Sequence, residues 1–320
     1  MKTTLSVIRL YPVVIILFLS FSASSQSISS KNGRYEIGAN MGSSFFLGDI
    51  GGNAGKGKTF IKDINIPNTK LAKGFFVSFI ATELIGLRFE YNHLLLQADD
   101  AAIADKGGDE IFRKQRNLNF RTKLSEALFA IEFYPTVLIE SNTDLQGKIR
   151  PYGIFGVGTF KFNPEGKYTD PNTGKTSWVK LQPLQLEGQG MTEYPDRKMY
   201  KLRQLEIPMG FGIKYFLTNN LYMGFETIYR KTFTDYIDDV STNYIDPLLF
   251  DTHLSTSNSQ LARQLYFKQN IVNPQVSRPS YDEQRGDPKD NDAYFTSMLR
   301  IGWRINTQSK GVELKCPKFY

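Results

Sequence analysis

The segment Leu205–Thr232, LEIPMGFGIKYFLTNNLYMGFETIYRKT, contains two runs of mostly alternating apolar residues joined by a short polar turn. The runs are Leu205–Leu217 and Leu221–Thr232, and a period of two is typical of strands with one apolar face. The turn, Thr218–Asn220, contains two asparagines, a residue type that tolerates the left-handed backbone of a hairpin. The segment therefore predicts an antiparallel β-hairpin.

Six further segments show a similar alternation, which gives eight predicted strands. The gaps between consecutive strands alternate between long and short, beginning with a long one. Barrels of the bacterial outer membrane have short periplasmic turns and longer extracellular loops. The pattern therefore predicts an all-β, eight-stranded antiparallel transmembrane β-barrel of the outer membrane, with long extracellular loops and periplasmic N- and C-termini. The predicted strands are Tyr35–Leu47, Lys73–Phe79, Leu87–Ala98, Leu118–Tyr134, Arg150–Phe162, Leu205–Leu217, Leu221–Thr232 and Ala293–Ile305.

The polar faces of these strands indicate which side points inward. They carry acids and bases in similar numbers, which can pair inside a narrow lumen. Neighbouring glycines would make room for these long side chains. A lipocalin-like soluble barrel or a β-sandwich is the alternative, but aromatic residues near strand ends, such as Tyr35 and Trp303, favour a membrane interface. The residues predicted to point inward are Glu36, Arg88, Glu90, Glu126, Glu132, Glu206, Lys214, Glu226, Arg230, Arg300 and Arg304, with Gly38, Gly156, Gly158, Gly210, Gly212 and Gly224.

The fourth predicted strand is less regular than the others. Its outward positions change from polar, between Asn119 and Ser125, to apolar, from Phe129 onward. Either a β-bulge near Ser125 or a strand that continues above the bilayer would explain the change.

Residues 1–26 have the features of a secretory signal peptide. Lys2 and Arg9 precede an apolar core at Val13–Phe21, and the small residues Ala23–Ser25 suit a cleavage site. An anchoring transmembrane helix is the alternative, but the core is shorter than the roughly 20 residues that a span needs. We expect a signal peptide at 1–26 and a barrel domain at 27–320 that ends in a short periplasmic tail.

The charge of the chain gives little support for nucleic-acid binding. The formal charge of +7 falls to +5 when Lys2 and Arg9 leave with the signal peptide. Basic residues are interleaved with acidic ones and form no long run. Phosphate-bearing lipid headgroups of the outer membrane, or an acidic partner, are better candidates for contact.

Two histidines are candidates for catalysis, because some outer-membrane barrels are lipid-modifying hydrolases. His93 is predicted to point toward lipid, but Leu95 stands where a nucleophilic serine would be needed. His253 lies beside Asp251 and the segment Ser255–Ser257, a combination that polar loops often produce by chance. We therefore predict that the protein is not an enzyme.

Metal and cofactor signals are weak. Asp235, Asp238 and Asp239 supply closely spaced oxygens, but they lack the spacing of an EF-hand. The segment Gly51–Lys58 lacks the spacing of a phosphate-binding loop. One cysteine and two distant histidines cannot form a zinc site unaided. We predict no metal, no cofactor and no small-molecule substrate.

The single cysteine, Cys316, follows the last predicted strand by about ten residues. With an even number of strands, this tail returns to the periplasm, which is oxidising. An unpaired cysteine in an exported protein suggests an intermolecular disulfide or a free thiol. An inert residue in the tail is the alternative.

Three segments together resemble a known family: Gly42–Ile50 (GSSFFLGDI), Thr234–Asp246 (TDYIDDVSTNYID) and Lys315–Phe319 (KCPKF). They are similar to the small outer-membrane barrels of Bacteroidetes that include PorG, the barrel component of the type IX secretion system. The strand pattern extends the resemblance over most of the chain after the signal peptide. The long segments 163–202 and 233–292 depart from the family in length.

The resemblance implies a non-enzymatic component of a protein-export machine. It would anchor or organise a periplasmic ring made of a lipoprotein and its partner, with Cys316 as a candidate tether to the lipoprotein. The alternatives are a lipid-modifying hydrolase and a structural or adhesive barrel without a role in secretion. In the motif loop we expect Thr234 and Ser241 to bond local backbone, Asp235, Asp238 and Asp239 to pair with basic loop residues or cap a turn, and Tyr236 and Tyr244 to pack over the barrel mouth.

Overall fold

A computed structural model describes residues 35–52, 68–103, 108, 110–139, 145–276 and 282–305 of the chain. The predicted signal peptide and the tail that contains Cys316 lie outside these residues. Within the described part, eight long strands form a barrel and two short ones form a hairpin beside it. The barrel strands are β1 (Tyr35–Leu47), β2 (Lys70–Ile80), β3 (Ile85–Asp99), β4 (Asn119–Phe133), β5 (Ile149–Lys161), β8 (Arg203–Phe216), β9 (Leu221–Thr232) and β10 (Ala293–Ile305).

The barrel is closed, because each of its strands pairs with two neighbours. The ring runs β1, β2, β3, β4, β5, β8, β9, β10 and returns to β1, and all eight pairings are antiparallel. Because the ring is closed, none of its eight strands is an edge strand. The predicted fold class, an eight-stranded antiparallel barrel, is confirmed. Every predicted strand is present, and each predicted boundary lies within three residues of the observed one.

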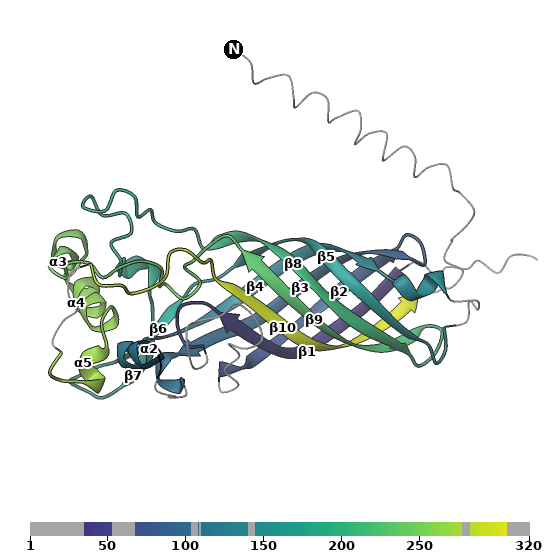
Figure 1. Cartoon of the computed structure of the whole chain (residues 1–320), viewed down its shortest axis with the longest axis horizontal. Coiled ribbons are helices and arrows are strands. Elements are labelled where there is room, and N and C mark those ends of the chain that lie inside the picture. The colour runs from purple at the N-terminus through teal and green to yellow at the C-terminus, as the bar shows by residue number, and fades with distance from the viewer. Residues whose placement is uncertain are drawn as a thin grey trace, which may run out of the picture.

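The two ends of the barrel differ in the length of their connections (Figure 1). The connections 81–84, 134–148 and 217–220 lie at one end, where β1 begins and β10 ends. We call this the short-turn end. The segments 48–69, 100–118, 162–202 and 233–292 connect strands at the opposite end, which we call the long-loop end. The predicted alternation of short and long connections is therefore confirmed.

The outer face of the barrel is apolar and its interior is charged. Large apolar side chains point outward along all eight strands, and Phe211, Leu299 and Phe155 are 66%, 63% and 58% exposed. All eleven charged residues predicted to point inward are buried. A soluble barrel has the opposite arrangement, with its apolar face inside. This distribution is that of a barrel whose outer surface faces lipid.

β4 continues beyond its pairing with β5 toward the long-loop end. Its register with β3 is continuous from Ile85↔Phe133 to Asp99↔Asn119, and its pairing with β5 stops at Ser125↔Lys161. Above that point, Arg121 pairs with Glu165 of the short strand β6. The extended strand, and not a bulge near Ser125, explains the polar outer face of this segment.

The long extracellular loops that the sequence predicts form a structured cap. β6 and β7 form a hairpin, and short helices occupy the other loops. Among the described residues, no helix is long and apolar enough to cross a membrane. The elements of the cap are β6 (Glu165–Thr169), β7 (Thr176–Lys180), α2 (Glu110–Arg116), α3 (Leu249–His253), α4 (Thr256–Leu265), α5 (Gln269–Val272) and the 3-10 turns η4 (Asp100–Ala102) and η6 (Gln182–Leu184); a further 3-10 turn, η5 (Pro135–Leu138), lies at the short-turn end.

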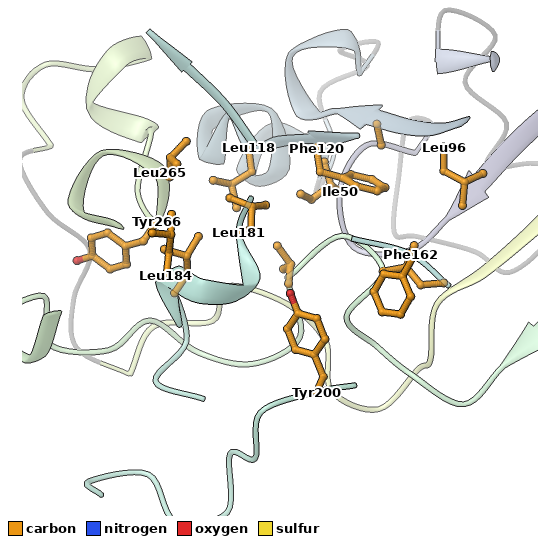
Figure 2. Close-up of a cluster of buried hydrophobic side chains, with 14 of the residues drawn as sticks. Ile50, Leu96, Leu118, Phe120, Phe162, Leu181, Leu184, Tyr200, Leu265 and Tyr266 are labelled. Atoms are coloured by element: carbon orange, nitrogen blue, oxygen red, sulfur yellow. The ribbon is translucent and has the colours of Figure 1, made fainter. Parts of the chain in front are cut away.

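A single apolar cluster holds the cap to the barrel mouth (Figure 2). It joins Leu118 and Phe120 at the start of β4 to Leu184 of η6 and Leu265 of α4. These side chains are buried almost completely, and each one removed from water contributes about 1.5–3 kcal/mol. The cap is therefore a packed extension of the fold.

Candidate functional site

A network of ion pairs fills the middle of the lumen. One oxygen of Glu226, Oε2, lies 2.6 Å from Nη1 of Arg88 and 2.7 Å from Nη1 of Arg300. Arg88 also contacts Glu132 and, at 2.9 Å, Glu90. The network links four strands, because its members lie on β3 (Arg88, Glu90), β4 (Glu132), β9 (Glu226) and β10 (Arg300). Such charges are costly to bury unless they are paired, and here the pairing is dense.

Two further groups of ion pairs lie toward the ends of the lumen. Near the short-turn end, Glu36 accepts hydrogen bonds from Lys214 at 2.6 Å and from Arg304 at 2.7 Å. Nearer the long-loop end, Arg230 contacts Glu126 with two nitrogens, each at 3.0 Å. The lumen therefore contains charged side chains along its length.

Aromatic side chains fill the remaining space between the ion pairs. Tyr152 donates a hydrogen bond to Glu226 at 2.6 Å, and the guanidinium of Arg300 lies 3.8 Å from the ring centre of Phe76. Two glycines provide the room: a Cβ on Gly212 or Gly302 would lie 2.5 or 2.2 Å from the ring of Tyr152 or Tyr222. The prediction that glycines make room for charged side chains is confirmed at Gly158, where a Cβ would lie 2.6 Å from Oε1 of Glu206, and is wrong at Gly212, which makes room for an aromatic ring.

Both ends of the lumen are covered. At the short-turn end, Leu145 from the β4–β5 connection is fully buried against Phe76, Phe216 and Tyr222. Asn219 of the β8–β9 turn holds this connection by accepting hydrogen bonds from the backbone of Leu145 and Gln146 at 3.0 Å. The cap covers the other end. The described barrel is thus a filled cylinder.

The motif segment that begins at Thr234 joins the cap to the end of β1. Asp238 accepts hydrogen bonds from the backbone N–H of Ile50 at 2.9 Å and of Val240 at 3.0 Å. Ile50 belongs to the first of the three family-like segments, so the structure brings two of those segments into contact. The third, around Cys316, lies outside the described residues.

The remaining motif residues have local roles, as expected for some of them. Thr234 accepts a hydrogen bond from the backbone N–H of Tyr236 at 3.3 Å, as expected, whereas the expected bond from the Ser241 hydroxyl to local backbone is not found among the described residues. Asp239 accepts a hydrogen bond from the hydroxyl of Tyr200 at 2.6 Å. The three motif aspartates were expected to pair with basic loop residues or to cap a turn. In the described part of the chain their side chains form no ion pair, and Asp238 caps a turn through the backbone N–H of Val240.

The two motif tyrosines lie in the aromatic packing of the cap, as predicted. Tyr236 stacks on Tyr200 with ring centres 4.8 Å apart, and Tyr244 meets the edges of Tyr266 and Phe267.

Residues that the sequence did not single out complete the cap. Glu187 accepts hydrogen bonds from the backbone of Ser241 and Thr242, and it pairs with Arg285 at 2.8 Å. Asp292, just before β10, accepts one from the backbone of Ile237 at 2.7 Å. These contacts join residues about 50 to 100 positions apart, and no local sequence pattern indicates them.

Five carboxyl groups of the cap, Asp49, Asp235, Asp238, Asp239 and Asp292, are here called the acidic cluster. Burial raises the pKa of Asp235 to about 9, that of Asp239 to about 7 and that of Asp49 to about 6. Burial, followed by the charge of neighbouring aspartates, also raises the pKa of Asp238 and of Asp292. Despite this concentration of acids, no group of three or more His, Cys, Asp or Glu side chains in the described residues is arranged to hold a metal ion.

Both histidines make contacts that the sequence did not indicate, although the outward direction of His93 is as predicted. His93 points outward, and its Nδ1 lies 3.1 Å from the hydroxyl of Ser125 on the neighbouring strand β4. The sequence prediction considered a serine on the same strand, at the position of Leu95. It therefore missed Ser125, which lies on the neighbouring strand. Ser125 is the only described residue hydrogen-bonded to His93, so no carboxylate or amide there orients the imidazole as in a catalytic triad.

The loop residues near His253 do not assemble into a triad. Nε2 of His253 lies 2.8 Å from Glu193, whereas Asp251 is held by Ser259 and Arg263. Ser255 accepts a hydrogen bond from the backbone of Asn258 and caps α4.

Comparisons with known proteins find similar barrels among solved structures. No family model matches the chain, and no curated protein matches it. The outer membrane protein OprG from Pseudomonas aeruginosa has a TM-score of 0.35 and 9% identity, over 86% of this chain and 97% of its own. Ail from Yersinia pestis has a TM-score of 0.33 and 9% identity, over 85% and 99%. A major outer membrane protein from Thermus thermophilus has a TM-score of 0.33 and 12% identity, over 85% and 99%. At these low scores and identities, the likeness is no guide to function.

Proposed function

We propose that the protein is a non-enzymatic barrel of the outer membrane that anchors or organises a protein assembly, with its termini in the periplasm. The observation that carries the proposal is the filled lumen, in which ion pairs and aromatic rings occupy the interior between two covered ends. A barrel without an open interior acts through its ends and its surface. Its short-turn end is the side at which β1 begins and β10 ends.

The finer proposal is a role in protein export, as a PorG-like component of a type IX secretion system in Bacteroidetes. The resemblance of the segments Gly42–Ile50, Thr234–Asp246 and Lys315–Phe319 to that family supports it. The barrel would contact a periplasmic ring of a lipoprotein and its partner. Cys316 is the proposed tether, through an intermolecular disulfide in the oxidising periplasm.

Affinity purification from cells tests the tether. The full-length protein and its Cys316→Ser variant are captured with and without reducing agent, and the bound proteins are identified. We expect a periplasmic lipoprotein with the wild type under non-reducing conditions only, and its loss in the variant. Equal recovery from both proteins would contradict the tether, and normal export of cargo in a deletion strain would contradict the export role.

A structural or adhesive barrel is the second candidate, and the packed cap favours it. The cap extends the fold beyond the barrel at the long-loop end and packs on the barrel mouth through one shared apolar cluster (Figure 2). A deletion strain with normal export but reduced attachment to surfaces or cells would support this function. A lipid-modifying hydrolase would instead require a changed lipid profile in a His93→Ala strain, and we expect that profile to be unchanged.

A further inference from the structure

A row of polar and basic side chains crosses the outer face of five adjacent strands. Each residue is the direct cross-strand partner of the next, and all five point outward. We call this set the basic row: Lys73 on β2, His93 on β3, Ser125 on β4, Lys161 on β5 and Arg203 on β8.

The basic row contains no acidic residue. Lys161 and Arg203 are directly opposed, a position in which like charges destabilise a sheet because the Cβ atoms lie about 4.5–5.5 Å apart. Lys123, two residues from Ser125 on the same face of β4, adds a further cation nearby. Within the described part of the chain, the exposed side chains of Lys73, Lys123, Lys161 and Arg203 form no ion pair. The arrangement therefore concentrates uncompensated positive charge on an outward-facing surface.

The basic row lies at the boundary of the apolar belt. The next outward row toward the short-turn end contains only uncharged residues, and below it no charged side chain points outward on these five strands. At the short-turn end, the outward positions near the strand ends carry aromatic residues such as Tyr35, Tyr215 and Trp303. The outer surface is thus cationic at one bilayer interface and uncharged at the other. The uncharged row consists of Phe75, Tyr91, Ala127, Thr159 and Leu205.

We propose that the basic row and Lys123 bind the phosphate groups of lipids in the leaflet at the long-loop end. The acyl chains would lie on the apolar belt directly below, so that one molecule meets both surfaces. Charge complementarity and the continuity of the row with the lipid-facing belt select a lipid over a soluble anion. Lys161 and Arg203 would share a phosphate, while the imidazole of His93 and the hydroxyl of Ser125 supply hydrogen bonds to its oxygens. This inference rests on the membrane placement of the barrel and is independent of the export role.

Lipid titration monitored by native mass spectrometry tests the proposal on the purified protein in detergent. The probes are diphosphorylated lipid A, the same lipid after enzymatic removal of its phosphates, and inorganic phosphate. The test variant is Lys161→Gln/Arg203→Gln. The control, Lys175→Gln/Lys180→Gln, removes the same charge from the exposed β6–β7 hairpin. All proteins are first checked for the compact electrophoretic mobility of a folded barrel.

We expect diphosphorylated lipid A to bind the wild type more tightly than either other probe. Each cation near a membrane surface contributes about a fivefold change in affinity, so the test variant should bind this lipid about 25-fold more weakly. The control should bind as the wild type does. If the double variant does not fold, the single variant Lys123→Gln should show about a fivefold loss. The proposal is overturned if the basic-row variants bind like the wild type, if the control loses affinity equally, if phosphate removal has no effect, or if inorganic phosphate binds as tightly.

Discussion

The substitution Glu226→Gln tests whether the ion-pair network in the lumen stabilises the barrel. Glu226 Oε2 accepts hydrogen bonds from Arg88 at 2.6 Å, from Arg300 at 2.7 Å and from Tyr152 at 2.6 Å. Glutamine retains the size of the side chain and removes the charge. Arg88 keeps Glu90 and Glu132, but the nearest remaining carboxylate to Arg300 is Glu132, at 3.8 Å.

The expected loss of stability follows from leaving Arg300 without a close counter-charge. Breaking a buried ion pair by changing one partner costs about 3–5 kcal/mol, because the other charge stays buried. We expect Glu226→Gln to lower the free energy of unfolding by about this amount. Replacing the stranded cation as well, in Glu226→Gln/Arg300→Met, should recover part of the loss and give a coupling energy of about 2 kcal/mol.

Urea unfolding in phospholipid vesicles, followed by tryptophan fluorescence, measures these free energies. Phe225→Leu is the matched control, since Phe225 precedes Glu226 on β9 and is 49% exposed on the outer face. It should change the free energy of unfolding by less than about 1.5 kcal/mol. A loss of unfolding free energy for Glu226→Gln no larger than that of the control would refute the argument. So would a loss in the double variant that exceeds the sum of the losses in the two single variants.

Three further predictions concern packing and the cap. Gly302→Ala should destabilise the barrel by about 1–3 kcal/mol in the same assay, because its Cβ would lie 2.2 Å from the ring of Tyr222, whereas Gly153→Ala, with nothing within 4 Å, should have little effect. Asp238→Ala should increase amide hydrogen exchange at Ile50 by leaving a buried donor unpaired, and Asp196→Ala, at an exposed site, should not. The acidic cluster binds protons more tightly when the cap is folded, so cap stability should be greatest at acidic pH and fall as pH rises through about 6 to 9. Hydrogen exchange corrected for intrinsic rates would show greater protection of the cap at pH 5 than at pH 9, and the reverse order would contradict this assignment.

The barrel could be predicted from the sequence because its signals are local. A period of two within one strand marks both faces, and the turn Thr218–Asn220 sets the register of its hairpin. The bounds of β1, β9 and β10 were predicted to the residue. The inward charges were also predictable, since Glu226 and Arg230 share the face that alternates with apolar Phe225 and Tyr229.

The cap and the cross-strand contacts could not be predicted in the same way. Glu187 meets Arg285 about 100 residues later, and nothing near either residue indicates the pairing. The contact of His93 with Ser125 depends on which strands are neighbours and on their register. The cap helices are short. The helix α4 begins after the capping residue Ser255, in a segment rich in polar residues, and such a segment is predicted to be a loop. These helices are stabilised by packing of Tyr266 and neighbouring side chains against residues that are distant in the sequence.

Ion conductance in planar bilayers tests the central claim most directly, because the proposed function follows from the filled lumen. The account predicts that the inserted wild-type protein shows no stable single-channel current, since the lumen is occupied by ion pairs and covered by Leu145 at one end and by the cap at the other. Insertion is verified independently by protease protection of the strands. Steady, ohmic channels from correctly inserted wild-type protein would contradict the account.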